Sequence, residues 1–178
     1  GNLSDFSPRA IEALENCDFI AAEDTRVTLK LLNHFGITKP LVSYHEHNKR
    51  ERGEQICARL LAGENGVLVS DAGMPAISDP GEDLVKQCAA AGIVVCAIPG
   101  PCAAITALSI SGQATGRFCF EGFLPQKKGR NTRLTALQEE TRTMVFYESP
   151  YRVLKTLKQF AEFFGEDRLA SASREISK

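Results

Sequence analysis

The stretch that decides the fold is VLVSDAGMPAISDPG, residues 67–81. Val67–Val69 has the β-branched, apolar composition of a buried strand, and Ser70–Pro75 follows it as a loop of small residues. A second break at Asp79-Pro80 opens a helical pattern. A strand, a loop that could hold a ligand and a helix together predict the first part of a βαβ unit.

Short apolar runs and helical patterns alternate on both sides of this stretch, which favours an α/β fold with a largely parallel sheet and flanking helices. The run Ile93–Ile98 is apolar throughout, which is typical of a strand covered on both faces. The expected strands are 19–22, 41–44, 67–69 and 93–98. The expected helices begin at Ser7-Pro8, at a Thr25 cap, at Arg50 and at Asp79-Pro80, the last with Leu84, Val85 and Cys88 facing inward.

The pattern changes near Gly112–Gly116, and we expect two α/β domains, 1–114 and 117–178. The second domain should hold a mixed sheet, incomplete in this chain. Its expected strands are 118–123, 143–147 and 169–173. Ser149-Pro150 is expected to cap a helix with Val153, Leu157, Phe160 and Phe164 on one face.

Composition limits the classes of function. The chain of 178 residues has a net charge of −1, whereas proteins that bind nucleic acid along their whole surface are usually basic. No apolar run approaches the roughly 20 residues of a membrane span. None of the six cysteines lies in a CxxC motif, which favours buried thiols in a reducing, cytoplasmic protein and argues against a structural metal.

Two strand ends are candidate ligand loops, because open α/β sheets bind ligands beyond the carboxyl ends of their strands. They are Ser70–Pro75 and Pro99–Ala103, where glycine and small residues allow close approach to the backbone. Neither GxGxxG nor GxxxxGK[ST] occurs. An adenosine ligand without phosphates, such as S-adenosylmethionine, would suit loops that lack Lys and Arg. The alternative is that both are ordinary βα turns.

Several stretches, in order along the whole chain, resemble the tetrapyrrole methylase superfamily, and most closely its branch that acts on ribosomal RNA. They are GNLSD (1–5), AAEDTR (21–26), VSDAGMPAISDPG (69–81), PGPCAAITAL (99–108), FYES (146–149) and SREISK (173–178). The resemblance implies 2′-O-methylation of a cytidine in the 16S rRNA of the small ribosomal subunit, with S-adenosylmethionine between two domains of a homodimer. It also implies a strand before Gly1 and an extension after Lys178.

The resemblance further implies where the cofactor binds. Ala72-Gly73-Met74-Pro75 stands where the tetrapyrrole enzymes have Gly-Gly-Asp-Pro, so backbone contacts should replace the missing aspartate. The cofactor-binding residues that we expect are Gly1, Ser70, Asp71, Ala72, Gly73, Met74, Pro75, Pro99, Gly100, Pro101, Cys102, Ala103, Tyr147 and Glu148.

Methyl transfer to a ribose oxygen depends mainly on alignment, which supplies about 7–11 kcal/mol, while a base adds about 10²–10⁴-fold. The candidates for the base are Glu148, Glu175 and Asp71, which all follow predicted strands. Each could instead cap a helix or pair with an arginine. We therefore expect a variant without the base to be slow rather than inactive.

Polar residues elsewhere are candidates for binding RNA. Glu23, Asp24 and Arg26 close the first strand, and His45 ends the second. His45 and His47 would point the same way on a strand, but two ligands are weak evidence for a metal. Lys127, Lys128 and Arg130 lie on a polar loop that could hold phosphates or simply be solvated.

Two other functions stay open at this point. The cleft could hold a corrin or sirohaem precursor instead of RNA, although the missing aspartate and the AAEDTR turn speak against it. The chain could also be a module that binds the cofactor without turning it over.

Overall fold

The computed structural model describes residues 2–177, which form two compact α/β units. The first unit runs up to Cys102, and the second comprises Ala103–Ile176. Helix α5 (Ala103–Ser109) therefore belongs to the second unit. The sequence places the boundary of its two domains later, between residues 114 and 117.

The first unit is built on a parallel sheet in the order β2-β1-β3. Strand β1 (Phe19–Ala22) lies between β2 (Leu41–Ser43) and β3 (Gly66–Val69), and all four of its residues are buried. Its neighbours pair in register, with Ala22 opposite both Ser43 and Val69. The parallel sheet predicted from the sequence is confirmed.

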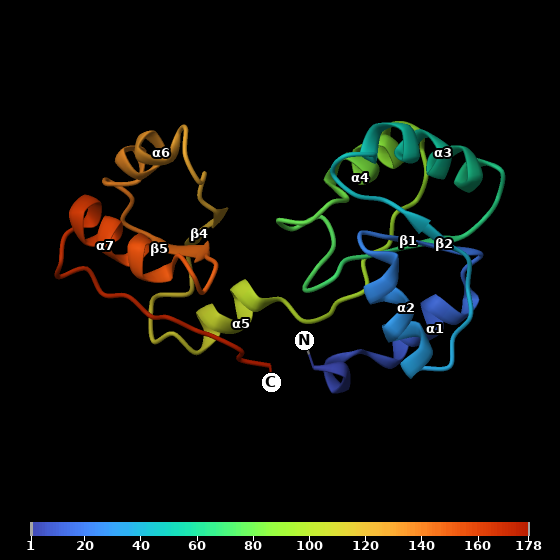
Figure 1. The fold of residues 1–178 in the computed structure, drawn as a ribbon, viewed down its shortest axis with the longest axis horizontal. Helices are drawn as coiled ribbons and strands as arrows, with labels where there is room; N and C mark the ends of the chain where they lie inside the picture. The colour runs from blue at the N-terminus through green and yellow to red at the C-terminus, as the bar shows by residue number, and fades with distance from the viewer. Residues whose placement is uncertain (1, 178) are drawn as a thin grey trace. The chain divides into compact units, whose positions relative to one another are not determined.

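Helices cover both faces of this sheet (Figure 1). Phe19 and Ala21 pack with residues of α3 (Lys49–Leu61) and α4 (Glu82–Ala90). Ile20 points the opposite way, as alternation along a strand requires, and packs with Leu14 and Leu32. Those leucines belong to α1 (Pro8–Asn16) and α2 (Thr25–His34), which follow a short 3₁₀ helix, η1 (Leu3–Asp5).

The helix starts agree with the predictions only in part. Ser7 caps α1 as expected, since its side chain accepts a hydrogen bond from the N–H of Ala10. The cap of α2 is Asp24 and not Thr25, because the Asp24 carboxylate accepts the N–H of Arg26. Helix α4 begins at Glu82, later than predicted, and Val85 is exposed on it.

The predicted strand Ile93–Ile98 is wrong, because this segment pairs with no strand within residues 2–177. Val94 is 86% exposed and Val95 is 51% exposed. Arg9 donates a hydrogen bond to the carbonyl of Ala97 at 3.0 Å. An apolar run indicates that a segment favours burial, but a strand forms only where a neighbouring strand completes its backbone hydrogen bonds.

The second unit holds two parallel strands, β4 (Phe118–Phe123) and β5 (Thr143–Tyr147), with a register shift between Phe120 and Gly122. This pair is all that the described chain contains of the expected mixed sheet. The predicted strand Leu169–Ser173 is wrong: this segment is irregular, and Leu169 is 82% exposed. The helices α5, α6 (Arg130–Ala136) and α7 (Val153–Phe164) complete the unit.

Helix α7 starts one turn later than the Ser149-Pro150 signal predicts. The N–H of Arg152 donates to the carbonyl of Ser149, and the helix begins at Val153. The predicted apolar face is half-buried at its end, where Phe160 packs on the ring of Phe146 with centroids 4.7 Å apart, while Val153 is exposed. None of the helices described between residues 2 and 177 is long and apolar enough to cross a membrane.

The close approach of β1 and β3 can be tested at Gly66. A Cβ atom there would lie 2.5 Å from the ring of Phe19, a fully buried side chain. We expect Gly66→Ala to lower the free energy of unfolding by about 1–3 kcal/mol, because the strand pair cannot move apart without loosening the core. Urea denaturation measures this, with Gly116→Ala as the matched control, since a Cβ at Gly116 meets nothing within 4 Å. Equal effects of the two substitutions would contradict the packing described.

Candidate functional site

The carboxyl ends of the three strands in the first unit carry a cluster of polar residues. Glu23 directly follows β1, His45 lies two residues after β2, and Ser70 and Asp71 follow β3. Because the strands are parallel, these ends share one edge of the sheet, which is where α/β proteins bind ligands. The structure thus brings together candidates that the sequence could place only on separate loops.

A contact between the backbone and a carboxylate joins the ends of β1 and β3. The N–H of Asp24 donates to Oδ1 of Asp71 at 3.3 Å. The turn after the central strand is therefore held against the loop after its neighbour.

Asp79 belongs to this edge, and the sequence analysis missed it as a site residue. It is half-buried, and the negative charge of Asp71 acts on it. Asp79 lies eight residues beyond Asp71, with the whole loop between them, so neither spacing nor periodicity links the two. The only local pattern at this position is the Asp79-Pro80 pair, which predicts a helix start.

Burial and mutual repulsion change the proton affinity of this cluster. Burial raises the pKa of Glu23, and the negative charges of Asp71 and Asp79 raise it further. The N–H of Asp71 and the nearby His45 act in the opposite direction on the pKa of Glu23 without cancelling the rise. Burial likewise raises the pKa of Asp79, and Asp71 adds to it. These carboxylates hold protons more tightly than exposed ones.

The loop from Ser70 to Gly81 has an unusual backbone. The Ser70 hydroxyl donates to the carbonyls of Ala72 and Gly73, at 3.3 and 3.4 Å. Ala76 and Ser78 have φ angles of 68° and 57°, in the left-handed region that non-glycine residues rarely occupy. Such strained residues gather at ligand sites, because the surrounding structure must hold them in place.

Each of the two predicted cofactor loops has a glycine whose backbone is open to approach. Gly73, at φ +80°, and Gly100 have no atom within 4 Å of where a Cβ would lie, so their backbones are open to approach. Ala72 is exposed beside Gly73, while Met74 and Pro75 are half-buried. Carboxylates lie at the same edge of the sheet, so the surroundings of the first loop complement a positively charged ligand.

The second loop lies directly before α5. Pro99, Gly100 and Pro101 are exposed and Cys102 is half-buried. Helix α5 begins at Ala103, so Pro101 precedes the helix. The remaining predicted cofactor residue, Gly1, lies outside the described residues.

Asp24 and Arg26 form an ion pair at 2.6 Å on the rim of this edge. Hydrogen bonds from Arg26 hold the pKa of Asp24 well below its usual range. The Arg26 side chain is 87% exposed, so its charge can meet a ligand in solvent even though it is paired. Asp24, in contrast, has a structural role as the cap of α2.

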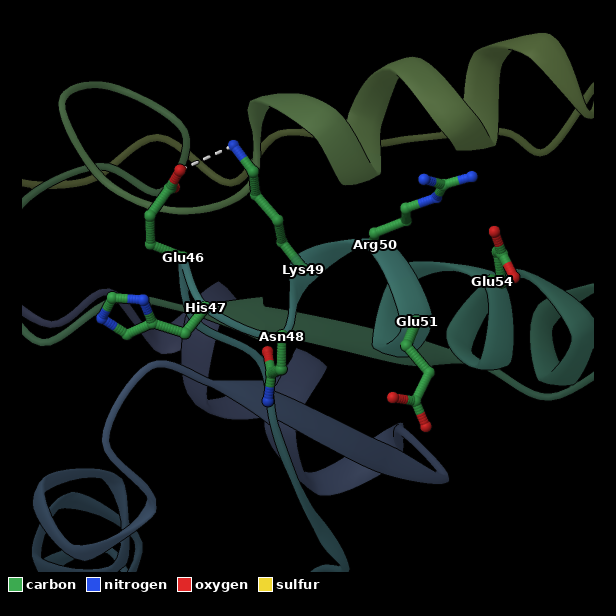
Figure 2. A pocket seen from close by; sticks show the side chains of 7 residues that line it. All are labelled: Glu46, His47, Asn48, Lys49, Arg50, Glu51 and Glu54. Carbon is green, nitrogen blue, oxygen red and sulfur yellow. Dashed lines mark ion pairs between the residues drawn. The ribbon is translucent and has the colours of Figure 1, made fainter.

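An open hollow of about 510 Å³ lies where the β2–α3 turn meets the first turns of α3 (Figure 2). Lys49 reaches Glu46 at 2.8 Å and Asp83 at 2.6 Å, so the hollow presents paired charges. His45 stands just before this turn, and its buried Nδ1 atom has no hydrogen-bond partner in the described chain. Its ring centroid is 6.0 Å from that of His47, and residues 2–177 contain no group of three side chains suited to a metal.

In the second unit, Tyr147 at the end of β5 joins the start of α5. Its hydroxyl accepts a hydrogen bond from the N–H of Ala104 at 3.2 Å. Its ring packs against Phe120 and Phe123, with centroids 5.2 and 5.3 Å away. Two segments predicted to bind the cofactor, Ala103 and Tyr147, are thereby brought close to each other within this unit.

Glu148 lies inside a polar network, and both of its carboxylate oxygens are already hydrogen-bonded within the protein. Oε2 accepts the Thr156 hydroxyl at 2.6 Å and lies 3.7 Å from Arg130, and Oε1 accepts from Arg152 at 3.1 Å. Burial alone would raise the pKa of Glu148, but the bonds from Thr156, the Ser149 N–H and Arg152 together lower it. A carboxylate stabilised in this way is a weak proton acceptor.

Arg130 is buried and does not lie on the exposed polar loop where the sequence placed it. Its guanidinium donates to Thr156 at 2.6 Å, to Gln159 at 2.8 Å and to the carbonyl of Pro125 at 3.2 Å. Lys127 and Lys128 are the exposed cations of that loop. Glu175 is exposed, in a left-handed conformation with φ of 53°.

The whole chain is similar in sequence to known methyltransferases. The model of the tetrapyrrole (corrin/porphyrin) methylase family matches residues 1–178. Ribosomal RNA small subunit methyltransferase I from Pseudomonas aeruginosa is 52% identical over all of this chain and 64% of that protein. The proteins of the same name from Escherichia coli O157:H7 and Synechocystis are 51% and 52% identical. The chain thus spans 63–64% of the length of these relatives.

Solved structures of low sequence identity share the fold. A diphthine synthase matches 89% of this chain and 68% of its own, with a TM-score of 0.63 and 15% identity. The methyltransferase CobJ matches 89% of this chain and 72% of its own, with a TM-score of 0.59 and 20% identity.

The role of Glu148 gives a stability prediction. We expect Glu148→Gln to lower the free energy of unfolding at pH 7 by roughly 3 kcal/mol, because it leaves the buried Arg130 without its anion. The lowered pKa of Glu148 means that its ionised form stabilises the fold above the ordinary carboxyl range, and that this stability is lost as pH falls through the folded pKa. Denaturation at a series of pH values should show the two proteins converge in acid. Glu162→Gln, on the exposed side of α7, is the control, and an equally small effect of both would refute the network.

Proposed function

Because the chain belongs to the tetrapyrrole methylase family, we propose that it carries out methyl transfer from S-adenosylmethionine to the 16S rRNA of the small ribosomal subunit. The observation that carries this proposal is about 50% identity, over the whole chain, to relatives named ribosomal RNA small subunit methyltransferase I. The acceptor that we propose is the 2′ oxygen of a cytidine ribose.

The proposed cofactor site uses the two loops with open backbones. Gly73 and Gly100 would let the nucleoside lie against the main chain, while Ser70 and the strained residues after it fix the shape of the first loop. Within the second unit, Tyr147 and Ala103 are candidates for contact with the cofactor. S-adenosylmethionine, when bound, supplies an electrophilic methyl group on a cationic sulfur, and the acidic edge complements that charge.

Positioning is the main task that we assign to these residues. A rigid loop that holds the donor and a rim that holds the ribose bring the reacting atoms into line, and alignment of this kind is worth about 7–11 kcal/mol. Rigid strands β1 and β3 carry the loop, and the buried Arg130–Glu148 network fixes the end of β5 beside Tyr147. Arg130 and Glu148 therefore act as positioning residues.

The proposed RNA contacts are electrostatic and lie on exposed cations. Lys127 and Lys128 would grip phosphates, and Arg26 would meet the RNA at the rim of the acidic edge. Such contacts orient RNA without reading its sequence. An assembled subunit presents the target in a fixed shape, which suits an enzyme whose net charge is close to zero. We also propose a homodimer in the cytoplasm, where cysteines outside disulfides, as the described ones are, persist.

The assay for this proposal uses the full-length protein and a tritiated methyl donor. Undermethylated small ribosomal subunits and a tetrapyrrole precursor are offered side by side. We expect label only in 16S rRNA, with one ribose made resistant to alkaline cleavage, because methylation removes the 2′ hydroxyl that attacks the chain. Label in the macrocycle would move the protein to tetrapyrrole synthesis, and binding of the donor with no transfer would make it a non-catalytic module.

The loop lysines give a separate prediction. We expect Lys127→Gln with Lys128→Gln to weaken binding to the subunit and to reduce the slope of log affinity against log salt by about 1–2, as loss of one or two phosphate contacts predicts. Filter binding across a salt series measures both quantities. The matched control neutralises Lys155 and Lys158, which are exposed on α7. If the two double variants behave alike, the loop is merely solvated.

A further inference from the structure

We propose that Glu23 is the group that takes the proton from the ribose hydroxyl, an inference that rests on the proposed function. Glu23 directly follows the central strand, between the ends of β2 and β3. It is half-buried, so it is shielded from bulk water and still accessible to a substrate. This position is next to the loop proposed to hold the methyl donor.

The turn that carries Glu23 is held by the loop after β3, since the N–H of the next residue, Asp24, donates to Oδ1 of Asp71 at 3.3 Å. The negative charges of Asp71 and Asp79, both on that loop, act on Glu23, and so does His45, two residues after β2. The buried Nδ1 of His45, at the same edge of the sheet, has no hydrogen-bond partner in the described chain, which leaves it for a ligand to satisfy.

The environment of Glu23 also suits proton transfer better than that of the other carboxylates. Burial, Asp71 and Asp79 raise its pKa, which makes its ionised form a stronger acceptor. Hydrogen bonds from Thr156, the Ser149 N–H and Arg152 lower the pKa of Glu148. Asp71 is exposed, and its Oδ1 accepts the N–H of Asp24, so it orders the turn that carries Glu23.

The proposed step balances without a further reactant. The ribose oxygen forms a bond to the methyl carbon, and the bond between that carbon and sulfur breaks with its electron pair on sulfur. The proton of the hydroxyl passes to the Glu23 carboxylate and then to water. The products are the 2′-methoxy ribose, the neutral thioether of the donor and one proton.

The test compares Glu23→Gln with Glu15→Gln in the full-length protein, using undermethylated small subunits. Glu15 is an exposed residue of α1 and serves as the matched control. We expect Glu23→Gln to lower kcat about 100-fold or more, the usual effect of losing a general base. Affinity for S-adenosylmethionine, measured by calorimetry, should stay within about threefold, because the amide keeps the size and shape of the carboxylate. Glu23→Asp should recover part of the rate.

Two further readouts separate proton transfer from a purely structural role. The rate of the natural enzyme should rise with pH as Glu23 ionises, and that limb should vanish in Glu23→Gln. Because the folded pKa of Glu23 is raised, its ionisation costs stability as pH rises through that pKa, so Glu23→Gln should unfold at a higher temperature than the natural protein at pH 7.

The results distinguish an error in the role of Glu23 from an error in the proposed function. If the natural protein labels no RNA, the proposed function falls, and this inference falls with it. If the natural protein is active and Glu23→Gln keeps its rate, only the role of Glu23 is overturned. Loss of donor affinity in Glu23→Gln, with kcat unchanged at saturation, would also overturn it and make Glu23 a cofactor-binding residue.

Discussion

The burial of one short strand determines most of the first unit. All four residues of β1 are buried, with Phe19 and Ala21 facing one pair of helices and Ile20 the other. A strand covered on both faces needs partners on both edges, and β2 and β3 supply them in parallel. Parallel pairing fixes the chain direction, so every loop that leaves this sheet towards a helix starts from the same edge. The candidate site follows from that constraint.

The carboxylates of the two units show how surroundings assign different roles to one functional group. Glu23 and Glu148 both follow a parallel strand directly. Glu148 contacts Arg130, Arg152 and Thr156, which stabilise its charge, whereas the charges that raise the pKa of Glu23 are those of the acids Asp71 and Asp79. The interactions of Glu148 stabilise the folded state, whereas the ionised form of Glu23 lowers the stability of the fold slightly. Sites built for chemistry commonly carry such a cost.

The sequence predicts those parts of the fold that depend on local pattern. The strands at Phe19 and Thr143 and the Ser7 cap were predictable, because periodicity and capping are local properties. The strand at Ile93–Ile98 was not, since it requires a neighbour that the pattern cannot identify. The loops of the site were predictable from the sequence, but their arrangement as one cluster was not. The charge of Asp79 acts on Glu23 only because the intervening loop folds back to this edge. Arg130 looked like a surface cation because burial of an arginine depends on distant partners, here Thr156 and Gln159.

The direction of the chain in these βα units has an electrostatic consequence. Helices α2, α3 and α4 each start from loops that leave the carboxyl edge, so each begins there. The unpaired N–H groups of a helix start carry a partial positive charge. The acidic edge thus lies among the positive ends of several helix dipoles, which are fixed in the backbone and cannot be removed by a side-chain substitution. The polarity of the fold itself lets Glu23, Asp71 and Asp79 lie close together without a buried lysine or arginine among them.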